Sequence, residues 1–590
     1  MTALLEISNL NVHFALADGD VHAVKDASLR VQEGECLGVV GESGSGKSQL
    51  FLAAFGLLAG NGRVTGSVRY RGEEILGAPA SRLNALRGGA VTMIFQDPLT
   101  SLTPHMKIGA QISEALMLHR KVSRAEAVAR ARDMLDFVRI PESARRLRQY
   151  PHELSGGMRQ RVMIAMATIT GPDLIIADEP TTALDVTVQA QILEILRALK
   201  SEKKTAIAMV SHDMGVIAGL ADRVQVMRHG EIVESGSAEE IFYAPRHDYT
   251  RMLLAAIPKA DEIPPPATAV GAPLLTVEDL KVSFPIKDAN FLGGLFGKTQ
   301  ELRAVDGVSF VLRQGETLGV VGESGCGKST LARAVLQLLP KTEGRVVWLG
   351  HDLGAQSDIR KLRKEFQIVF QGPLASLDPR MPVGLSIAEP LKALEPQLSR
   401  ETVRGKVRTI MQRVGLDPAW INRYPHELSG GQNQRVGLAR AMIVGPKMLV
   451  CDEAVSALDV SIQAQIVELI RDLQAETGLA LIFISHDLSV VRRLSHRVMV
   501  LYLGRVVEVA PSAILYTDPR HPYTRALLSA VLSPDPRAER ARKRELLTGD
   551  LPSPLDPRAQ LTFLKSRLNE PDYRPKLEQV APDHWVAEHD

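Results

Sequence analysis

One eight-residue pattern occurs twice in this chain and constrains its fold more than any other feature. The first copy is Gly41-Glu42-Ser43-Gly44-Ser45-Gly46-Lys47-Ser48, and the second is Gly322-Glu323-Ser324-Gly325-Cys326-Gly327-Lys328-Ser329. Both have the form G-x-x-x-x-G-K-S, which makes a phosphate-binding loop when it lies between a buried strand and a helix. The two lysines are 281 residues apart (328 − 47), about half of the 590-residue chain.

Other segments repeat in the same order. Glu179 and Glu453 are 274 residues apart (453 − 179), and so are His212 and His486 (486 − 212). The first apolar run, residues 4–10, matches residues 274–280. These offsets indicate a tandem duplication of one ATP-handling domain.

The local patterns around each loop predict an α/β fold. Short apolar strands end at Val39-Val40 and at Val320-Val321, and helix-forming residues follow each lysine. Later apolar runs, at residues 174–177 and 448–451, are typical of strands buried on both faces of a parallel sheet. Helix formers are concentrated between loop and strand, at residues 123–138 and 400–414. We therefore expect two tandem P-loop NTPase domains, each with a helical subdomain.

The glycines let backbone N–H groups turn around phosphates at the positive end of the following helix. The residues expected to bind nucleotide in this way are Gly41, Ser43, Gly44 and Gly46 in the first loop, and Gly322, Ser324, Gly325 and Gly327 in the second. Lys47 and Lys328 are expected to reach the β- and γ-phosphates, and Ser48 and Ser329 to bind Mg²⁺.

Carboxylate pairs end the later buried strands, as Asp178-Glu179 and Asp452-Glu453. The aspartates can hold Mg²⁺ through water, and the glutamates can act as bases toward the attacking water. A structural cap at the strand end is the alternative, which the following Leu184-Asp185 and Leu458-Asp459 segments disfavour.

Three further motifs resemble those of ABC-type ATPases over residues 1–530. Leu154-Ser155-Gly156-Gly157 and Leu428-Ser429-Gly430-Gly431 are similar to the signature motif of that family. Gln96 and Gln371 match its Q-loop glutamine, which is expected to contribute to Mg²⁺ binding as well as catalysis, and His212 and His486 match its switch histidine.

In that family two domains pack head to tail and enclose two ATP molecules. The resemblance implies that Ser429 and Gly431 complete the site of Lys47, Ser48, Gln96, Glu179 and His212. It equally implies that Ser155 and Gly157 complete the site of Lys328, Ser329, Gln371, Glu453 and His486, so that both sites hydrolyse ATP. Phe14 and Phe284 are candidates for stacking on adenine, with strand packing as the alternative.

We predict domains at residues 1–256 and 274–531, a linker at 257–273 and a C-terminal extension at 532–590. Three consecutive prolines, residues 264–266, favour extended geometry in the linker. An insertion in the second copy, residues 287–300, is expected to be a hairpin or a docking element. The basic stretch from Arg537 to Arg544 is expected to be a solvated helix or linker.

Charge, apolar runs and cysteine content argue against several classes of protein. The net charge of +2 gives no overall attraction to nucleic acid, and no apolar run is long enough to span a membrane. The N-terminus is expected to form a strand and not a signal peptide. Cys36, Cys326 and Cys451 are far apart, so zinc and disulfide frameworks are not expected.

The end of each copy resembles the dipeptide/oligopeptide importer ATPases. The matching stretches are Pro245-Arg246-His247-Asp248-Tyr249-Thr250 and Pro519-Arg520-His521-Pro522-Tyr523-Thr524. The fusion of two copies is similar to the Yej-type ATPases of peptide and microcin C uptake. The resemblance implies an ATPase at the cytoplasmic face of a bacterial inner membrane, with two transmembrane permease subunits and, indirectly, an extracytoplasmic peptide-binding protein.

Two alternatives remain: a soluble tandem ATPase acting on ribosomes or DNA, and an importer ATPase for another solute such as nickel or glutathione. The proline-rich linker and the lack of a C-x-x-C pair argue against the first. Many of these importers hold an iron–sulfur cluster on cysteines after a Pro-Ser-Pro stretch. Here no cysteine follows residues 552–554, and Leu561 lies near the first expected position, so we expect no cluster. Met158, Ala454 and Gly372 depart from their counterparts and could make the two sites unequal.

Overall fold

The computed structural model describes residues 3–16, 19–182, 184–257, 271–286, 300–355, 359–372, 374, 376–455, 458–545, 552–570 and 573–590. They fall into two compact units. Unit 1 contains Met1–Ile257, Asp459–Ser461 and Leu532–Gly549, and unit 2 contains Pro258–Leu458, Ile462–Val531 and Asp550–Asp590. Most of the predicted linker (258–270) and of the predicted insertion (287–299) lies outside the described residues.

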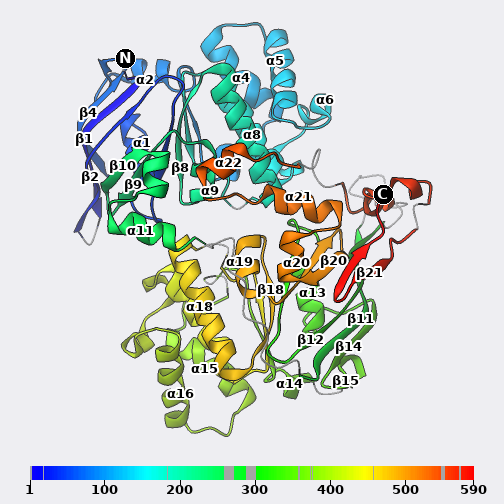
Figure 1. Ribbon diagram of the computed structural model, residues 1–590. Coiled ribbons are helices and arrows are strands. Elements are labelled where there is room, and N and C mark those ends of the chain that lie inside the picture. The colour runs from blue at the N-terminus through cyan, green and yellow to red at the C-terminus, as the bar shows by residue number, and fades with distance from the viewer. Residues whose placement is uncertain are drawn as a thin grey trace. The chain divides into compact units, whose positions relative to one another are not determined.

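Unit 1 contains two sheets (Figure 1). The antiparallel one has the order β2-β1-β4-β5, from β1 (Leu5–Leu16), β2 (Gly19–Val31), β4 (Gly62–Tyr70) and β5 (Glu73–Glu74). The other has the order β10-β9-β3-β8-β7-β6, from β3 (Cys36–Val40), β6 (Val91–Ile94), β7 (Leu174–Asp178), β8 (Ala206–Ser211), β9 (Arg223–Arg228) and β10 (Glu231–Ser237). Its strands are parallel from β9 to β6, and β10 is antiparallel. Every residue of β3 and β7 is buried, as the apolar runs predict.

The helices of unit 1 complete two cores. One core lies between the sheets and α1 (Lys47–Ala54), and the other joins the six-stranded sheet to a helical part. That part consists of α3 (Pro98–Ser101), α4 (Ile108–Arg120), α5 (Arg124–Phe137), α6 (Ser143–Arg146), η1 (Pro151–Glu153) and α7 (Gly156–Thr168). The remaining helices are α2 (Ala80–Leu86), α8 (Val186–Lys203), α9 (Met214–Leu220), α10 (Ala238–Tyr243), α11 (Asp248–Ala255) and α22 (Pro536–Ala541).

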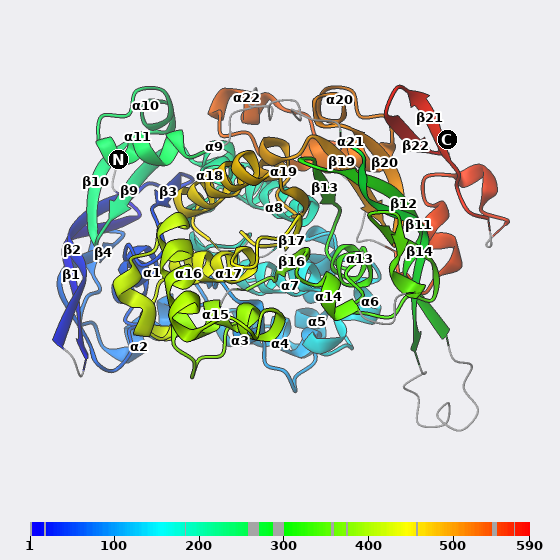
Figure 2. The same cartoon turned by 90° about the horizontal axis from the view of Figure 1, so that it is seen from below.

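Unit 2 repeats this plan and extends it. Its antiparallel sheet has the order β12-β11-β14-β15, from β11 (Pro273–Ile286), β12 (Gln300–Arg313), β14 (Glu343–Trp348) and β15 (His351–Asp352). Its larger sheet has the order β16-β17-β18-β13-β19-β20-β22-β21, from β13 (Thr317–Val321), β16 (Phe366–Val369), β17 (Met448–Asp452), β18 (Ala480–Ile484), β19 (Arg497–Tyr502), β20 (Arg505–Pro511), β21 (Leu577–Ala581) and β22 (His584–Ala587). Figure 2 shows β22 and β21 continuing the sheet beyond β20.

The helical part of unit 2 matches that of unit 1. It contains α15 (Val383–Leu394), α16 (Arg400–Arg413), η3 (Pro418–Asn422), η4 (Pro425–Glu427) and α17 (Gly430–Met442). The other helices are α13 (Lys328–Val335), η2 (Leu353–Ala355), α14 (Ile359–Leu362), α18 (Val460–Thr477), α19 (Leu488–Leu494), α20 (Ser512–Thr517), α21 (Pro522–Ala530), η5 (Pro557–Leu561) and η6 (Lys565–Arg567). The two domains of the predicted fold class, each with its helical subdomain, are therefore present.

The residues of the predicted C-terminal extension divide between the units. Residues 532–545 belong to unit 1, where α22 packs beside α9 and α10. The basic stretch is not solvated throughout, because Glu539 is 1% exposed and pairs with the nearly buried guanidinium of Arg544. Arg537, in contrast, is exposed and pairs with Glu239. A buried ion pair therefore anchors this segment.

Candidate functional site: two nucleotide-binding centres

The phosphate loops connect β3 to α1 in unit 1 and β13 to α13 in unit 2. Gly46 and Gly327 cap these helices with φ of 96° and 105°, a left-handed conformation that favours glycine. A Cβ at either position would also collide with a backbone carbonyl oxygen, that of Ala23 or Ala304. Neither helix start has a side-chain cap. The N–H groups at the two helix starts are thus available in the way that phosphate binding requires.

Each loop lysine lies against its own loop. Lys47 Nζ donates to the carbonyl oxygens of Gly41 at 2.7 Å and Glu42 at 2.8 Å. Lys328 Nζ donates to those of Gly322 at 2.7 Å and Glu323 at 2.9 Å. Both lysines are about 5% exposed, so burial places their charge at the loop rather than in solvent. Burial also lowers the pKa of Lys47.

The loop serines meet the strand-end aspartates. Ser48 Oγ donates to Asp178 Oδ1 at 2.8 Å, and Ser329 Oγ donates to Asp452 Oδ1 at 2.8 Å. Burial raises the pKa of both aspartates, although these hydrogen bonds work in the opposite direction. Hydroxyl and carboxylate oxygens are ligands that suit Mg²⁺, so the serine and aspartate of each unit would hold this ion. The predicted pairing of metal ligands is thus brought together in each unit.

The predicted catalytic glutamates lie among the expected partners. Glu179 accepts hydrogen bonds from Gln96 Nε2 at 2.9 Å and Thr182 Oγ1 at 3.0 Å, and its Oε1 is 3.2 Å from His212 Nδ1. In unit 2, Glu453 accepts from Gln371 Nε2 at 2.7 Å, and its Oε2 is 3.6 Å from His486 Nδ1. Because each amide nitrogen faces the glutamate, the oxygen of that amide is the atom able to bind a cation.

Burial opposes ionisation of Glu179, but the hydrogen bond and charge of His212 outweigh it and leave the pKa of Glu179 below its usual value. His212 responds in the opposite sense: Glu179 outweighs burial and raises the histidine pKa. His486 likewise lowers the pKa of Glu453, against the effect of burial. Both glutamates are therefore held as carboxylates at neutral pH, the form that a general base needs.

Backbone strain at these glutamates is a feature that sequence reasoning missed. Glu179 has φ of 47° and Glu453 has φ of 50°, in the left-handed region that costs non-glycine residues about 1 kcal/mol or more. In both cases the N–H donates to a strand carbonyl, that of Val210 or Ile484. No sequence signal specifies this, because glutamate has no preference for positive φ.

The signature serines begin the long helices of the two helical parts. Ser155 caps α7 by accepting from Met158 N, and Ser429 caps α17 by accepting from Gln432 N. Gln432 returns a second bond, since its Oε1 accepts from Ser429 N at 2.9 Å. Met158 has no oxygen to do so. Both serines are exposed, and Gly157 and Gly431 follow in the first helical turn.

For the remaining predicted residues, the structure gives the burial but does not test the predicted role. Phe14 in β1 and Phe284 in β11 are half-buried and pack against the cores next to the loops, so adenine stacking stays a prediction. The three cysteines are buried thiols. Leu561 is fully buried, and the prediction that no iron–sulfur cluster is held there also stays a prediction. Among the described residues, no helix has the length and apolar character needed to cross a bilayer.

Comparisons with known proteins agree with this geometry. The sequence matches the ABC transporter family at residues 24–182 and 305–456, and the oligopeptide/dipeptide transporter C-terminal region at residues 233–269 and 507–559. It is 45% identical over 618 residues to a protein of Salmonella choleraesuis named glutathione import ATP-binding protein GsiA, covering 99% of this chain and 96% of the relative. The protein of that name from Escherichia coli K12 is also 45% identical, over 99% and 97%.

Among solved structures, the dimeric ATP-binding cassette MJ0796 bound to ADP and phosphate is 26% identical, with a TM-score of 0.37; the match covers 40% of this chain and 98% of that one. The duplicated loops, carboxylates and signature helices define an ATP-binding cassette ATPase. The chain belongs to the ABC transporter family, in the dipeptide/oligopeptide importer group, and is an ATPase that powers transport. The resemblance drawn from its motifs is thereby confirmed.

Proposed function

We propose that this chain is the ATP-hydrolysing motor of a bacterial importer for short peptides, acting at the cytoplasmic face of the inner membrane with two permease subunits. The observation that supports the motor is the presence of a complete set of loop, carboxylate, glutamine and histidine contacts in each unit. The two matches to the oligopeptide/dipeptide C-terminal region support the peptide class. The relatives named for glutathione import make that tripeptide the first substrate to test.

We further propose that ATP is bound at two composite sites. Ser429 and Gly431 would contact the γ-phosphate held by Lys47, and Ser155 and Gly157 the one held by Lys328. Each signature serine is exposed at the start of a 13-residue helix, where N–H groups and the helix dipole favour an anion. An ATP that contacts both domains in this way binds more tightly when the domains are closed than when they are open. That difference in affinity drives domain closure.

The residues of each unit have separate roles in hydrolysis. Glu179 accepts the proton of the attacking water, and Gln96 and His212 fix its carboxylate on two sides. Lys47 neutralises phosphate charge as the γ-phosphate leaves. Mg²⁺, bound through Ser48 and Asp178, would offset the charge of the β- and γ-oxygens. The corresponding residues of unit 2 have the same roles.

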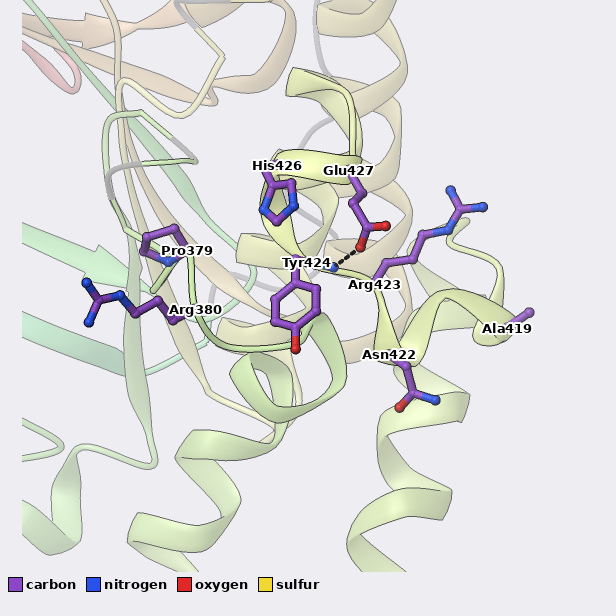
Figure 3. Close-up of a pocket in the computed structure, with 8 residues that line it drawn as sticks. All are labelled: Pro379, Arg380, Ala419, Asn422, Arg423, Tyr424, His426 and Glu427. Atoms are coloured by element: carbon purple, nitrogen blue, oxygen red, sulfur yellow. Dashed lines mark hydrogen bonds between the residues drawn. The ribbon is translucent and has the colours of Figure 1, made fainter. Parts of the chain in front are cut away.

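The permease subunits are proposed to dock on the helical parts. In unit 2 a cavity of about 700 Å³ opens between the segment after the Q-loop and the segment before the signature helix. Figure 3 shows its lining: Pro379, Arg380, Ala419, Asn422, Arg423, Tyr424, His426 and Glu427. Glu427 folds back to accept from Tyr424 N at 2.7 Å. A permease segment bound in this cavity would touch segments adjoining both Gln371 and Ser429. A change at the ATP site would therefore move the permease segment.

The test is co-purification with membrane subunits followed by ATPase assays in proteoliposomes. The chain is expected to recover two permease subunits, and ATPase activity should rise when binding protein loaded with peptide is added. Glutathione, a tripeptide without the γ-glutamyl bond and a nickel salt should be compared as ligands. Recovery of ribosomes or nucleic acid without permease would contradict the proposal. An Arg423→Glu variant should lose permease recovery and keep nucleotide binding.

A further inference from the structure

One tyrosine of each unit hydrogen-bonds the phosphate loop of that unit. The hydroxyl of Tyr249 accepts from Glu42 N at 3.1 Å, and the hydroxyl of Tyr523 accepts from Glu323 N at 3.1 Å. The tyrosines lie in α11 and α21 and are 2% and 0% exposed. Both lie in the segments that match the importer C-terminal region, outside the ABC match itself.

The peptide group before each loop glutamate is held from two sides. In unit 1 the carbonyl oxygen of Gly41 accepts from Lys47 Nζ, and the N–H of Glu42 in the same peptide group donates to Tyr249. In unit 2 the peptide group between Gly322 and Glu323 is held in the same way by Lys328 and Tyr523. Each lysine is also expected to bind the phosphates. The tyrosine hydrogen bond is therefore the one that can hold this peptide group while the lysine binds the nucleotide.

A common chain of hydrogen bonds fixes each tyrosine helix. His247 Nδ1 accepts from Tyr249 N at 3.1 Å, and His247 N donates to Glu234 at 3.1 Å. In unit 2, His521 Nδ1 accepts from Tyr523 N at 3.2 Å, and His521 N donates to Glu508 at 3.0 Å. Burial lowers the pKa of His521 to about 3, which keeps this ring neutral and its Nδ1 an acceptor.

What covers the tyrosine differs between the units. The last residues of β9 and β19 occupy the same place: the guanidinium of Arg228 lies 4.7 Å from the ring centre of Tyr249, and the ring of Tyr502 lies 4.7 Å from that of Tyr523. Unit 2 adds Phe563, whose ring centre is 5.3 Å from that of Tyr502 and 6.0 Å from that of Tyr523. Aromatic packing of this kind is stabilising beyond the area it buries.

Phe563 is itself held by residues of the C-terminal extension. Its carbonyl oxygen accepts from Asp590 N at 2.9 Å, and β22 pairs with β20. From β22, His584 Nε2 lies 2.8 Å from Glu508 Oε1, inside the chain of bonds that leads to Tyr523. Phe563 thus contacts the ring of Tyr523, and His584 contacts the carboxylate behind its helix.

We propose that Tyr249 and Tyr523 are positioning residues of the phosphate loops. We further propose that Phe563 and His584 hold the second loop more firmly, so that the Lys328 loop binds ATP more tightly than the Lys47 loop. The inference does not depend on the transported solute, because it concerns ATP binding alone. A loop already fixed in its binding conformation loses less freedom when the nucleotide binds.

The hydroxyl is tested with Tyr249→Phe and Tyr523→Phe, which keep the rings. Mg²⁺ and a fluorescent ATP analogue are titrated into full-length chain carrying Lys328→Ala or Lys47→Ala, so that a single loop is read. Each Phe variant is expected to raise the Kd of its own loop about 3- to 10-fold, the range of one net hydrogen bond. In the chain that keeps both lysines, kcat at saturating ATP should change less than about 2-fold. An unchanged Kd for both variants overturns the positioning role.

The difference in ATP affinity between the two loops is tested with Phe563→Leu and Phe563→Ala. Thermal melting checks that both variants fold. Both should raise the Kd of the Lys328 loop, Ala more than Leu, and leave that of the Lys47 loop within about 2-fold. In the otherwise unaltered protein the Lys328 loop should have the lower Kd. An equal rise at both loops, or a lower Kd for the Lys47 loop, overturns the proposal, and Phe563→Leu decides if the Ala variant does not fold.

Discussion

The two units repeat their catalytic contacts closely and differ in what surrounds them. The serine–aspartate bond is 2.8 Å in both, and both strand-end glutamates have positive φ. The larger sheet, in contrast, ends at β10 in unit 1 among the described residues, and continues through β22 and β21 in unit 2. The contacts of the candidate sites are therefore alike in the two units, whereas the same fold has different supports at its edge.

The prediction with the largest expected effect tests whether both candidate sites, whose contacts are alike, hydrolyse ATP. Replacing Glu179 by Gln, or Glu453 by Gln, keeps the shape and removes the base, so each single variant should lower steady-state ATPase turnover about 100-fold or more if the sites are coupled. Turnover is measured in phosphate-release assays with the permease present. Glu126→Gln, on the exposed face of α5, is the control and should keep activity. A single variant that keeps half of the turnover would show independent sites.

The next prediction concerns the edge of the larger sheet, where a buried glutamate in unit 2 corresponds to a half-buried one in unit 1. Glu508 is fully buried and accepts from Arg520 N and His521 N beside His584, while its counterpart Glu234 is half-buried and makes the same two backbone bonds. Glu508→Ala should lower the free energy of unfolding of unit 2 by about 2–4 kcal/mol, because it leaves buried donors unpaired. Glu234→Ala should cost about 1 kcal/mol, because water reaches the donors. Urea unfolding followed by far-UV circular dichroism measures both variants, with tryptophan fluorescence reporting unit 2 alone because Trp348, Trp420 and Trp585 all lie there. Equal losses would contradict this.

The sequence predicted the repeated parts well because phosphate chemistry imposes fixed residue types and spacings. The loops, the strand-end carboxylates and the signature helices all lie where their motifs indicate. The helices expected at residues 123–138 and 400–414 are α5 and α16, within one or two residues. In these segments local pattern and tertiary packing favour the same structure.

The edge of the second unit was not predictable in this way. Strands β21 and β22 are short, and β21 is largely exposed, so their alternation carries little signal. The burial of Glu539 depends on packing against α9, and the low exposure of the Arg544 side chain goes with its ion pairs to Glu539 and to Glu194 of α8; both helices are far away in sequence. The strain at Glu179 likewise arises from tertiary bonds and has no local cause. Such features require the three-dimensional arrangement of the chain.

A smaller effect concerns the signature helices. Gln432 accepts from Ser429 N, and Met158 in unit 1 cannot. Gln432→Met makes the second signature like the first and should cost about 0.5–1 kcal/mol of unfolding free energy by removing one capping bond. ATPase turnover should fall less than about 3-fold, since the phosphate-facing N–H groups remain. Met158→Leu is the matched control in unit 1. A 10-fold loss of turnover would show that Gln432 acts on the nucleotide directly.

The smallest expected effect is a pH dependence that compares the two histidine–glutamate pairs. The pKa of His212 is raised, so its contribution to stability is complete below about pH 6.5 and is lost as pH rises through the raised value. The pKa of Glu179 is lowered, so its contribution is complete above about pH 4.5 and is lost as pH falls through the lowered value. The pair is therefore strongest between about pH 4.5 and 6.5.

His212→Ala should destabilise unit 1 by about 0.5–1 kcal/mol at pH 6 and by less at pH 9, as read from urea unfolding at both values. His486→Ala should show a smaller dependence, because its ring nitrogen lies 3.6 Å from Glu453 rather than the 3.2 Å between His212 and Glu179. His152→Ala, an exposed histidine before the signature, is the control. If the two histidine variants depended on pH equally, the distances would not set the strength of the pairs, and the two catalytic centres would be electrostatically equivalent despite their different surroundings.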